Sequence, residues 1–357
     1  MPAVNVLIVD DNPIVRRILT EMISEDRSVT VVGTASNGRE ALNRIPDLNP
    51  DVLVLDIEMP VMDGLETMEV LRKNHPGIVV IIFSTHTERG AACTLKALSR
   101  GASDYVCKPS GGPEVVRQVV RSSLIPKVKA FVANEGSGGQ PEPVPPLTRK
   151  TESRSFDCTP NRAAVDVPEM LLIGSSAGGP QALSQLMPVL DKTFLLPVLI
   201  VQHMPPMFTR LFAQRLDKVC ALEVREAQEG DSVQPGRVLI APGDYHMELV
   251  KLNGGYQVTL NQGPMENYCR PAVDPLFRSA AHLLGPRLIA VMLTGMGQDG
   301  SEGSRAVHEA GSRILVQDKE SSMVWGMPGS VANAGLADEI LPLDELPGAI
   351  MARCKLK

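Results

Sequence analysis

A stretch rich in glycine, proline, serine and charged residues interrupts the chain between residues 136 and 161. It begins Gly-Ser-Gly-Gly-Gln-Pro-Glu-Pro-Val-Pro-Pro and has no apolar period, so it cannot bury a core and is typical of a linker. Apolar runs resume at residues 170–173. We therefore predict that the 357 residues form two domains, 1–122 and 168–357, joined by a flexible linker over residues 123–167.

Composition excludes several classes of protein. Hydrophobic residues make up 43% and charged residues 21% of the chain, and the net charge of −6 gives no electrostatic case for nucleic acid. The chain opens with an apolar strand instead of a basic leader, and no apolar run approaches the ~20 residues of a membrane span. The six cysteines are scattered without a CxxC pair. We expect a cytoplasmic protein that neither binds nucleic acid nor inserts into a membrane.

The first ~120 residues alternate apolar strand-like runs with helical segments, as in a parallel α/β sheet. Asn12 is placed to cap the first helix, and Pro13 takes its first position. Five strands with intervening helices match the flavodoxin-like (βα)5 layout, in which ligands bind at the carboxyl ends of the strands. The expected strands are residues 4–9, 29–34, 52–55, 78–83 and 105–107, and the first two helices are residues 13–24 and 37–44.

Three acidic residues follow the first and third of these strands: Asp10, Asp11 and Asp56. Adjacent parallel strands bring such ends together, so three carboxylates would crowd one pocket. Their repulsion is costly unless a hard dication lies among them, and oxygen ligands favour Mg²⁺. A carboxylate beside that ion can attack a phosphoryl donor and form an aspartyl phosphate.

Two further strand ends point to the same pocket. Lys108 ends the fifth strand and would place an ammonium on the phosphoryl oxygens, while Ser84 or Thr85 ends the fourth and would offer a hydroxyl. Taken singly, an acidic pair is usually a turn or a helix cap, and a Lys-Pro pair is usually a loop. Their conjunction at successive strand ends favours a function.

Residues 4 to about 120 resemble the receiver domain of bacterial response regulators, through the acidic pair, the LDIEMPVMDG segment and the Lys-Pro pair. The resemblance implies phosphorylation by a histidine kinase. Ser84 is preferred over Thr85 as the switch residue because the family follows its switch hydroxyl with a small residue. The implied site consists of Asp56 as phosphoacceptor, Asp10, Asp11 and the carbonyl of Glu58 around Mg²⁺ with it, and Ser84, Tyr105 and Lys108 as switch residues.

The second domain is predicted to be a doubly wound parallel-sheet α/β domain, with a small-residue turn after its first strand. Gly174-x-Ser176-x-Gly178 satisfies the nucleophile-elbow pattern, in which a turn exposes a hydroxyl next to helix N–H groups. The alternative interpretation of this turn is a loop that binds phosphate or a dinucleotide, but neither GxGxxG nor GxxxxGK[ST] is present. The expected strands are residues 170–173, 198–201, 237–241, 288–293 and 313–316.

His203 and Asp299 also follow predicted strands, so a serine, a histidine and an aspartate each lie where an α/β active site belongs. His246 is also near a strand end and is the second choice for the histidine. The order Ser…His…Asp differs from the Ser…Asp…His of α/β-hydrolases, which disfavours that fold. Triads are recognised by geometry and role rather than by chain order.

Residues from about 168 to 350 are similar to the catalytic domain of chemotaxis protein-glutamate methylesterases, the CheB family. The strings that carry this resemblance are IGSSAGGP, QHMPPMFTRLFAQRL, APGDYHMEL, RPAVDPLF, LTGMGQDG and WGMP. It implies Ser176 as nucleophile, His203 as general base and Asp299 as the residue that orients the base.

The resemblance also implies a surrounding site. The Met296 N–H would help to bind the oxyanion, and Ala177 stands where the family often carries threonine, so that hydroxyl is absent here. Arg270 either contacts an acidic receptor helix or forms a structural ion pair. No cofactor is expected in this domain.

The two resemblances together imply a phosphorylation-activated hydrolase of glutamyl methyl esters on chemoreceptor helices. They leave open whether it also deamidates receptor glutamines. We further expect the unphosphorylated receiver to cover the catalytic cleft. One alternative is a response regulator whose output domain only binds a partner, and another is a small-molecule esterase with the same triad.

Overall fold

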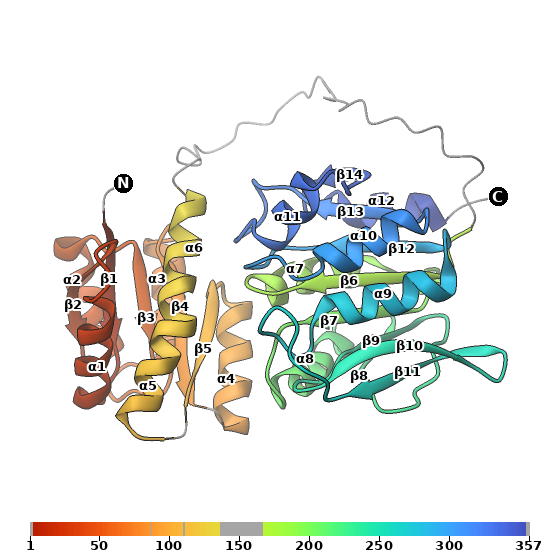
Figure 1. Cartoon of the computed structure of the whole chain (residues 1–357). Helices are drawn as coiled ribbons and strands as arrows, with labels where there is room; N and C mark the ends of the chain where they lie inside the picture. Colours follow the sequence, from red (N-terminus) through yellow and green to blue (C-terminus); the bar gives the residue numbers. More distant parts are fainter. Residues whose placement is uncertain (1–2, 86, 110, 136–166, 355–357) are drawn as a thin grey trace.

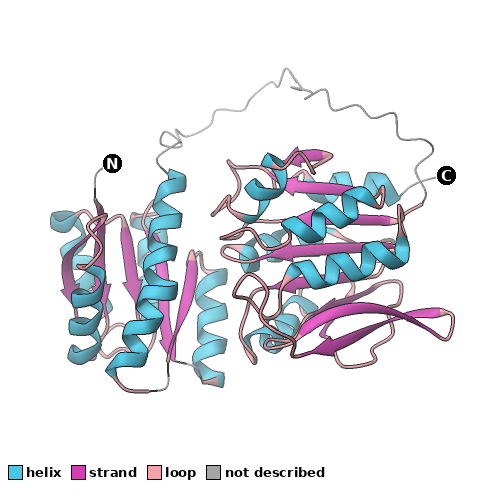
Figure 2. Ribbon diagram, viewed as in Figure 1, coloured by secondary structure: helices cyan, strands magenta, loops and turns pink. Residues whose placement is uncertain are grey.

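The computed structural model describes residues 3–85, 87–109, 111–135 and 167–354, which form two α/β units side by side (Figures 1 and 2). Residues 136–166 of the predicted linker lie outside the described residues. Within the described ranges, no helix is both long and apolar enough to cross a membrane. Each unit has its own parallel sheet covered by helices, which confirms the predicted fold class.

The N-terminal unit is a five-stranded parallel sheet in the order β2-β1-β3-β4-β5. Its central strands are continuous apolar runs because helices cover both faces of the sheet. The predicted first helix begins as expected, with the Asn12 side chain accepting from the Ile14 N–H at 2.9 Å. The elements are β1 (Val4–Val9), α1 (Pro13–Ile23), β2 (Val29–Ala35), α2 (Gly38–Leu48), β3 (Val52–Leu55), α3 (Gly64–Asn74), β4 (Val79–Thr85), α4 (Glu88–Ser99), β5 (Asp104–Lys108), α5 (Pro113–Val119) and α6 (Ile125–Glu135).

Helical structure in this unit continues beyond the predicted domain boundary at residue 122. A π-helical turn, Val120–Leu124, joins α5 to α6, so residues 123–135 are helical and their assignment to the linker was wrong. Val128 and Phe131 are buried, and they lie three residues apart on one helix face. The predicted boundary followed the end of the receiver resemblance and overlooked this apolar pair.

The C-terminal unit is a seven-stranded sheet in the order β14-β13-β12-β6-β7-β9-β8, with every pair parallel. Helices lie on both of its faces (Figure 2). The elements are β6 (Met170–Ser175), α7 (Gly179–Leu186), a short 3₁₀ helix (Met187–Val189), β7 (Val198–Gln202), α8 (Phe208–Asp217), β8 (Glu223–Glu226), β9 (Arg237–Ile240), β10 (His246–Leu252), β11 (Gly255–Asn261), α9 (Val273–Leu284), β12 (Leu288–Met292), α10 (Ser301–Glu309), β13 (Arg313–Gln317), α11 (Met327–Asn333), β14 (Glu339–Leu341) and α12 (Leu346–Cys354).

The antiparallel hairpin β10–β11 was not foreseen. It forms a separate two-stranded sheet beside α9 and is absent from a simple doubly wound plan. Burial alternates from Met247 to Val250 within β10, because one face packs on the core and the other is half-buried. The loop that follows β11 runs to the start of α9 and carries residues of the site described below.

The two units share an apolar interface. Helix α4 packs against α7 and α8, and the carboxyl ends of the C-terminal strands face the N-terminal unit (Figure 1). The Tyr105 ring stacks on the Phe208 ring, with centroids 4.8 Å apart. At the rim, Arg210 pairs with Glu88 at 2.9 Å, and the Gln181 amide donates to the Ala102 carbonyl. The buried surfaces of the two units are therefore continuous.

Candidate active site and acidic pocket

An acidic pocket forms where β1 and β3 end, since these strands are neighbours in the sheet. Carboxylate oxygens of Asp10, Asp11 and Asp56 lie within 4.8 Å of one another. Asp10 and Asp56 are buried, and Lys108 Nζ lies 2.7 Å from Asp10 Oδ2 and 2.6 Å from Asp56 Oδ2. The structure thus brings together the acidic residues and the lysine that the sequence singled out.

Electrostatics in this pocket favour an added cation. Burial raises the pKa of the Asp56 carboxyl, the Lys108 ammonium opposes that rise, and the nearby Asp10 adds to it. For Lys108, burial disfavours the charge, but the two carboxylates outweigh it and raise the pKa of the ammonium. A site with only oxygen donors and crowded negative charge suits Mg²⁺.

The predicted switch residues flank the pocket. Ser84 is buried near the end of β4, and its hydroxyl donates to the Gly90 carbonyl at 3.5 Å, whereas Thr85 is half-buried and lies 3.3 Å from the Thr87 hydroxyl. Tyr105 points away from solvent into the interface with Phe208. The Glu58 carboxylate pairs with Arg89 Nε at 3.2 Å. The role predicted for Glu58 concerns its backbone carbonyl and does not involve this carboxylate.

The serine turn follows β6 in the other unit. Ser175 is fully buried and donates to Gln202 Oε1 at 2.7 Å, while Ser176 is half-buried. The Gln202 amide in turn donates to the Ser176 carbonyl at 2.9 Å, and the Ser176 N–H donates to the Thr294 carbonyl at 3.0 Å. Gly178, the residue that precedes α7, has φ +76°, a conformation that glycine adopts without strain. The turn leaves the Ser176 hydroxyl as the one available for chemistry.

The half-buried His203 and the buried Asp299 form a pair beside this turn. His203 Nε2 lies 2.7 Å from Asp299 Oδ2. Burial disfavours the charged ring, but Asp299 and then Cys269 outweigh it and raise the pKa of His203 to about 10. Burial likewise opposes ionisation of Asp299, but His203 and the backbone N–H groups of Val273 and Asp274 lower the pKa of this carboxyl.

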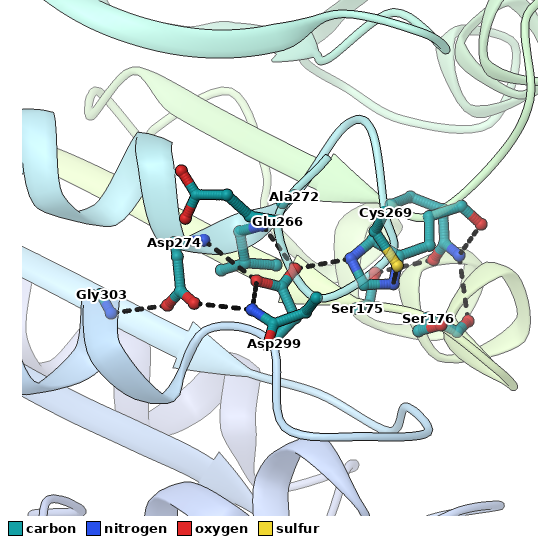
Figure 3. Close-up of polar contacts among 12 residues, drawn as sticks. Ser175, Ser176, Glu266, Cys269, Ala272, Asp274, Asp299 and Gly303 are labelled. Atoms are coloured by element: carbon teal, nitrogen blue, oxygen red, sulfur yellow. Dashed lines mark hydrogen bonds and ion pairs between the residues drawn. The ribbon is translucent and has the colours of Figure 1, made fainter. Parts of the chain in front are cut away.

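The second ring nitrogen of His203 faces a thiol. Cys269 Sγ lies 3.4 Å from His203 Nδ1 (Figure 3). Among the hydrogen bonds of the described residues, none joins the Ser176 hydroxyl to His203. Strands β6, β7 and β12 are neighbours in the sheet, so the structure brings Ser176, His203 and Asp299 to one edge and joins two of them directly.

Met296 and Ala177 are the two residues that were predicted to lie near the oxyanion. Met296 is half-buried in the loop before Asp299, and Ala177 belongs to the buried cluster that includes Val106 and Phe131 of the N-terminal unit. The Ala177 carbonyl accepts from the Thr294 hydroxyl at 2.9 Å. Ala177 therefore lies at the contact between the two units as well as next to Ser176.

Arg270 and His246 both make contacts within the fold. Arg270 pairs with Asp244 at 2.6 Å and donates to the Gly263 carbonyl at 2.8 Å, so the predicted ion pair is present and its contact with substrate stays a prediction. His246 is buried and bonds Pro264 O at 2.9 Å through Nε2, and its Nδ1 accepts from the Ala272 N–H at 3.2 Å. Both ring nitrogens of His246 are used, which excludes the second choice for the base in this structure.

Sequence reasoning missed three residues around the pair: Asn267, Cys269 and Asp274. Asp274 lies in the RPAVDPLF string and is acidic in the first turn of α9, a signal that could have been followed. Asn267 and Cys269 lie in a loop without any pattern, and no sequence signal points to them.

Comparison with known proteins agrees with both resemblances. The family model "CheB methylesterase" matches residues 171–350, and the "Response regulator receiver domain" model matches residues 6–121. A protein-glutamate methylesterase/protein-glutamine glutaminase of Nocardioides sp. is 47% identical, covering 99% of this chain and 96% of that protein. One of the same name from Trichodesmium erythraeum is 46% identical, covering 99% of each. The crystal structure of the Thermotoga maritima CheB methylesterase catalytic domain has a TM-score of 0.51 and 43% identity, covering 52% of this chain and 98% of that one.

Proposed function

This chain belongs to the CheB methylesterase family and carries a response regulator receiver domain ahead of the catalytic domain, and we propose that it hydrolyses glutamyl methyl esters on chemoreceptors under the control of phosphorylation. The observation that carries the proposal is the convergence of Ser176, His203 and Asp299 at the carboxyl ends of three neighbouring strands. A serine, a base and a carboxylate so arranged suit acyl transfer.

In this mechanism Ser176 Oγ attacks the ester carbonyl, and Nδ1 of the neutral His203 ring accepts its proton because Nε2 is committed to Asp299. The raised pKa of His203 makes this neutral form a minor one near neutral pH, so the rate should rise with pH. Asp299 holds the ring and stabilises the imidazolium. The ring then gives the proton to the departing methoxide, which leaves as methanol, and water attacks the acyl-enzyme by the same route to release glutamate. Backbone N–H groups near Met296 support the oxyanion, since Ala177 has no hydroxyl.

The same acyl-enzyme would form from a receptor glutamine, with ammonia as the leaving group in place of methanol. The relatives named above are called glutaminases as well as methylesterases. We propose both activities for this site, and ammonia release from unmodified receptor tests the second.

In the receiver, we propose that a chemotaxis histidine kinase is the phosphodonor and that Asp56 is the acceptor. Asp10, Asp11 and Asp56, with the Glu58 carbonyl, would hold Mg²⁺, which offsets the charge of the incoming phosphoryl group. Lys108 lies between Asp10 and Asp56 and is placed to contact phosphoryl oxygens. Kinase, protein and the cytoplasmic helices of the receptor would meet in the cytoplasm.

The interface supports control by occlusion. Ala177, next to the proposed nucleophile, is buried in a cluster with receiver residues, and Tyr105 stacks on Phe208. Phosphorylation that repositions Tyr105 would loosen this contact and uncover the cleft. Deletion of residues 1 to about 165 should raise the unphosphorylated rate, and an unchanged or lower rate would count against occlusion.

The primary test measures methanol release from methylated receptor membranes, with and without acetyl phosphate and Mg²⁺. We expect release to rise with the phosphodonor and to fall back in Asp56→Ala. Ser176→Ala should abolish release while phosphorylation of Asp56 persists, and Ser175→Ala, the adjacent serine, should lose far less. No release from folded wild-type protein would favour an output domain that only binds a partner.

A further inference from the structure

A tight turn, Glu266–Cys269, lies between β11 and α9 beside the catalytic pair. The Cys269 N–H donates to the Glu266 carbonyl at 2.8 Å, and the Glu266 N–H donates to the Cys269 carbonyl at 3.2 Å. Asn267 and Tyr268, the central residues, have φ values of 50° and 62°, as in a primed hairpin turn. Tyrosine adopts this left-handed conformation at a cost that glycine avoids. The turn therefore holds its side chains in fixed directions.

Asn267 contacts the carboxylate end of the pair. Its Nδ2 donates to Asp299 Oδ1 at 3.1 Å and to Asp274 Oδ2 at 3.0 Å. Asp274 is 2% exposed, and its other oxygen accepts from the Gly303 N–H at 2.6 Å. Two buried carboxylates so close repel each other unless donors lie between them. The amide of Asn267 supplies those donors and leaves Asp299 Oδ2 directed at His203.

Cys269 contacts the opposite end of the pair. Nε2 of His203 is directed at Asp299, and the raised pKa of the ring keeps Nδ1 protonated as well, so Nδ1–H donates to Cys269 Sγ 3.4 Å away. Nδ1 is the atom that the proposed mechanism requires for the Ser176 proton. One turn thus holds both ends of the His203–Asp299 pair.

We propose that the turn Glu266–Cys269 is a positioning element of the active site: Asn267 fixes Asp299, and Cys269 holds His203 by its base nitrogen until Ser176 takes the thiol's place. The proposal rests on the acyl-transfer function above. Both residues act through others and do not touch the reacting ester.

The chain contains a matched control turn at the tip of β10–β11. Asn253 and Gly254 have φ values of 52° and 81° between the paired residues Leu252 and Gly255. Asn253 occupies the same turn position as Asn267 but is exposed to solvent. Substitution at the two asparagines therefore has a similar local cost, and differs in the contact with buried carboxylates.

The first experiment compares Asn267→Asp with Asn253→Asp in the full chain, by methanol release in acetyl phosphate and Mg²⁺. Aspartate tolerates the left-handed conformation about as well as asparagine. In Asn267→Asp it replaces an amide donor with a third carboxylate, which should displace Asp299 and lower kcat about 100-fold with KM nearly unchanged. Asn253→Asp should stay within about twofold. Equal, small effects at both positions would overturn the role of Asn267.

The second experiment compares pH profiles of kcat/KM for Cys269→Ala, Cys269→Ser and the distant control Cys354→Ser. Loss of the thiol contact that raises the pKa of His203 should move the acid limb of Cys269→Ala down by about one pH unit. Cys269→Ser retains an oxygen that can accept from Nδ1–H and should stay near the wild type, as should Cys354→Ser. Coincident profiles for all four proteins would overturn the role of Cys269.

The groups that face the ring define what else titrates there. Asp299 and Cys269 contact the ring itself. Asp274, in the first turn of α9, interacts with Asp299 and with Arg278, which pairs with Glu266 at 2.7 Å. Burial raises the pKa of Asp274 to about 6, so its titration contributes to any limb near that pH in every variant with Asp274 intact.

A measurement that does not require turnover can test the role of the turn independently of the proposed function. The low-field proton resonance of the His203–Asp299 hydrogen bond can be followed in the folded full chain. It should disappear or move in Asn267→Asp and persist in Asn253→Asp. If wild-type protein releases no methanol, the proposed function fails, but this resonance still decides the role of the turn. An unchanged resonance in Asn267→Asp would overturn it.

Discussion

Two buried aspartates, one in each unit, end a strand against a cationic side chain, and their ionisation is perturbed in opposite directions. Asp56 Oδ2 lies 2.6 Å from Lys108 Nζ, and Asp299 Oδ2 lies 2.7 Å from His203 Nε2. Burial nevertheless raises the pKa of Asp56, whereas that of Asp299 is lowered despite its burial. The distance to the cation therefore does not decide the ionisation.

The number of hydrogen bonds that each carboxylate accepts explains why the two pKa values shift in opposite directions. Asp299 accepts from the Val273 N–H at 2.6 Å and the Asp274 N–H at 3.3 Å in addition to His203. Asp56 accepts from the Ile57 N–H at 2.7 Å, and it shares Lys108 with Asp10. A carboxylate with several donors stays ionised and holds a neighbour in place. One with few donors and a like charge nearby stays open to a metal ion and an incoming phosphoryl group.

The largest expected effect comes from removing the charge of the carboxylate that accepts the most hydrogen bonds, Asp299. Asp299→Asn keeps the shape but loses the charge that stabilises the imidazolium and fixes the tautomer, so kcat for methanol release should fall about 10⁴-fold. Asp56→Asn should keep the unphosphorylated rate and lose only its stimulation by acetyl phosphate. Similar losses in both variants would mean that the two carboxylates do not have the separate roles described here.

The His203–Asp299 pair should also make stability depend on pH. The pKa of His203 is raised from 6.5 to about 10 in the folded protein. This stabilisation is fully present below pH 6.5 and is lost as the pH rises toward 10, with a slope of up to about 1.4 kcal/mol per pH unit. Urea unfolding of wild type and His203→Gln over that range measures it. Parallel curves would contradict a proton shared by the folded pair.

Mg²⁺ should stabilise the protein only by binding the acidic pocket of the receiver. At a Mg²⁺ concentration 100 times its Kd, the free energy of unfolding should rise by about 2.7 kcal/mol, because the ion binds only the folded receiver. Asp10→Asn should lose this stabilisation, and Asp299→Asn should keep it. Thermal unfolding with Mg²⁺, and with Ca²⁺ as a comparison ion, provides the measurement, and an equal loss in Asp299→Asn would contradict the assignment.

The smallest effect is expected at the rim of the interface that joins the two regions. Arg210 and Glu88 pair at 2.9 Å, with both side chains largely exposed, and such pairs contribute at most about 1 kcal/mol. Arg210→Ala should raise the unphosphorylated rate by no more than about fivefold. Arg17→Ala, which breaks the exposed Arg17–Glu21 pair on α1, is the control and should leave the rate unchanged.

Much of the fold could be predicted because it depends on local pattern. Buried parallel strands such as β1 and β6 are continuous apolar runs, and turn residues mark their ends, so the strand-end positions of Asp56, Ser176 and His203 follow from the sequence. The hairpin β10–β11 and the helical residues 123–135 were missed, because their formation depends on packing against α9 and the sheet rather than on composition.

The candidate site likewise has one part that the sequence predicts and another that it does not. The residue types and strand ends that identify the acidic pocket and the Ser–His–Asp set lie in short, regular strings, and the roles given to them remain predictions. The sequence could not show that Arg270 has an ion-pair partner; only the position of Asp244 in the fold shows it.

The sequence by itself determined two α/β domains, their order and the chemistry carried at their strand ends, because these follow from hydrophobic period and local motifs. Only the tertiary structure decided which groups satisfy the buried charges. Asn267, Cys269 and Asp274 reach the His203–Asp299 pair from a loop and a helix distant in sequence from His203. Desolvated carboxylates and imidazoles take their ionisation from neighbours within hydrogen-bond distance, and folding alone brings those neighbours together.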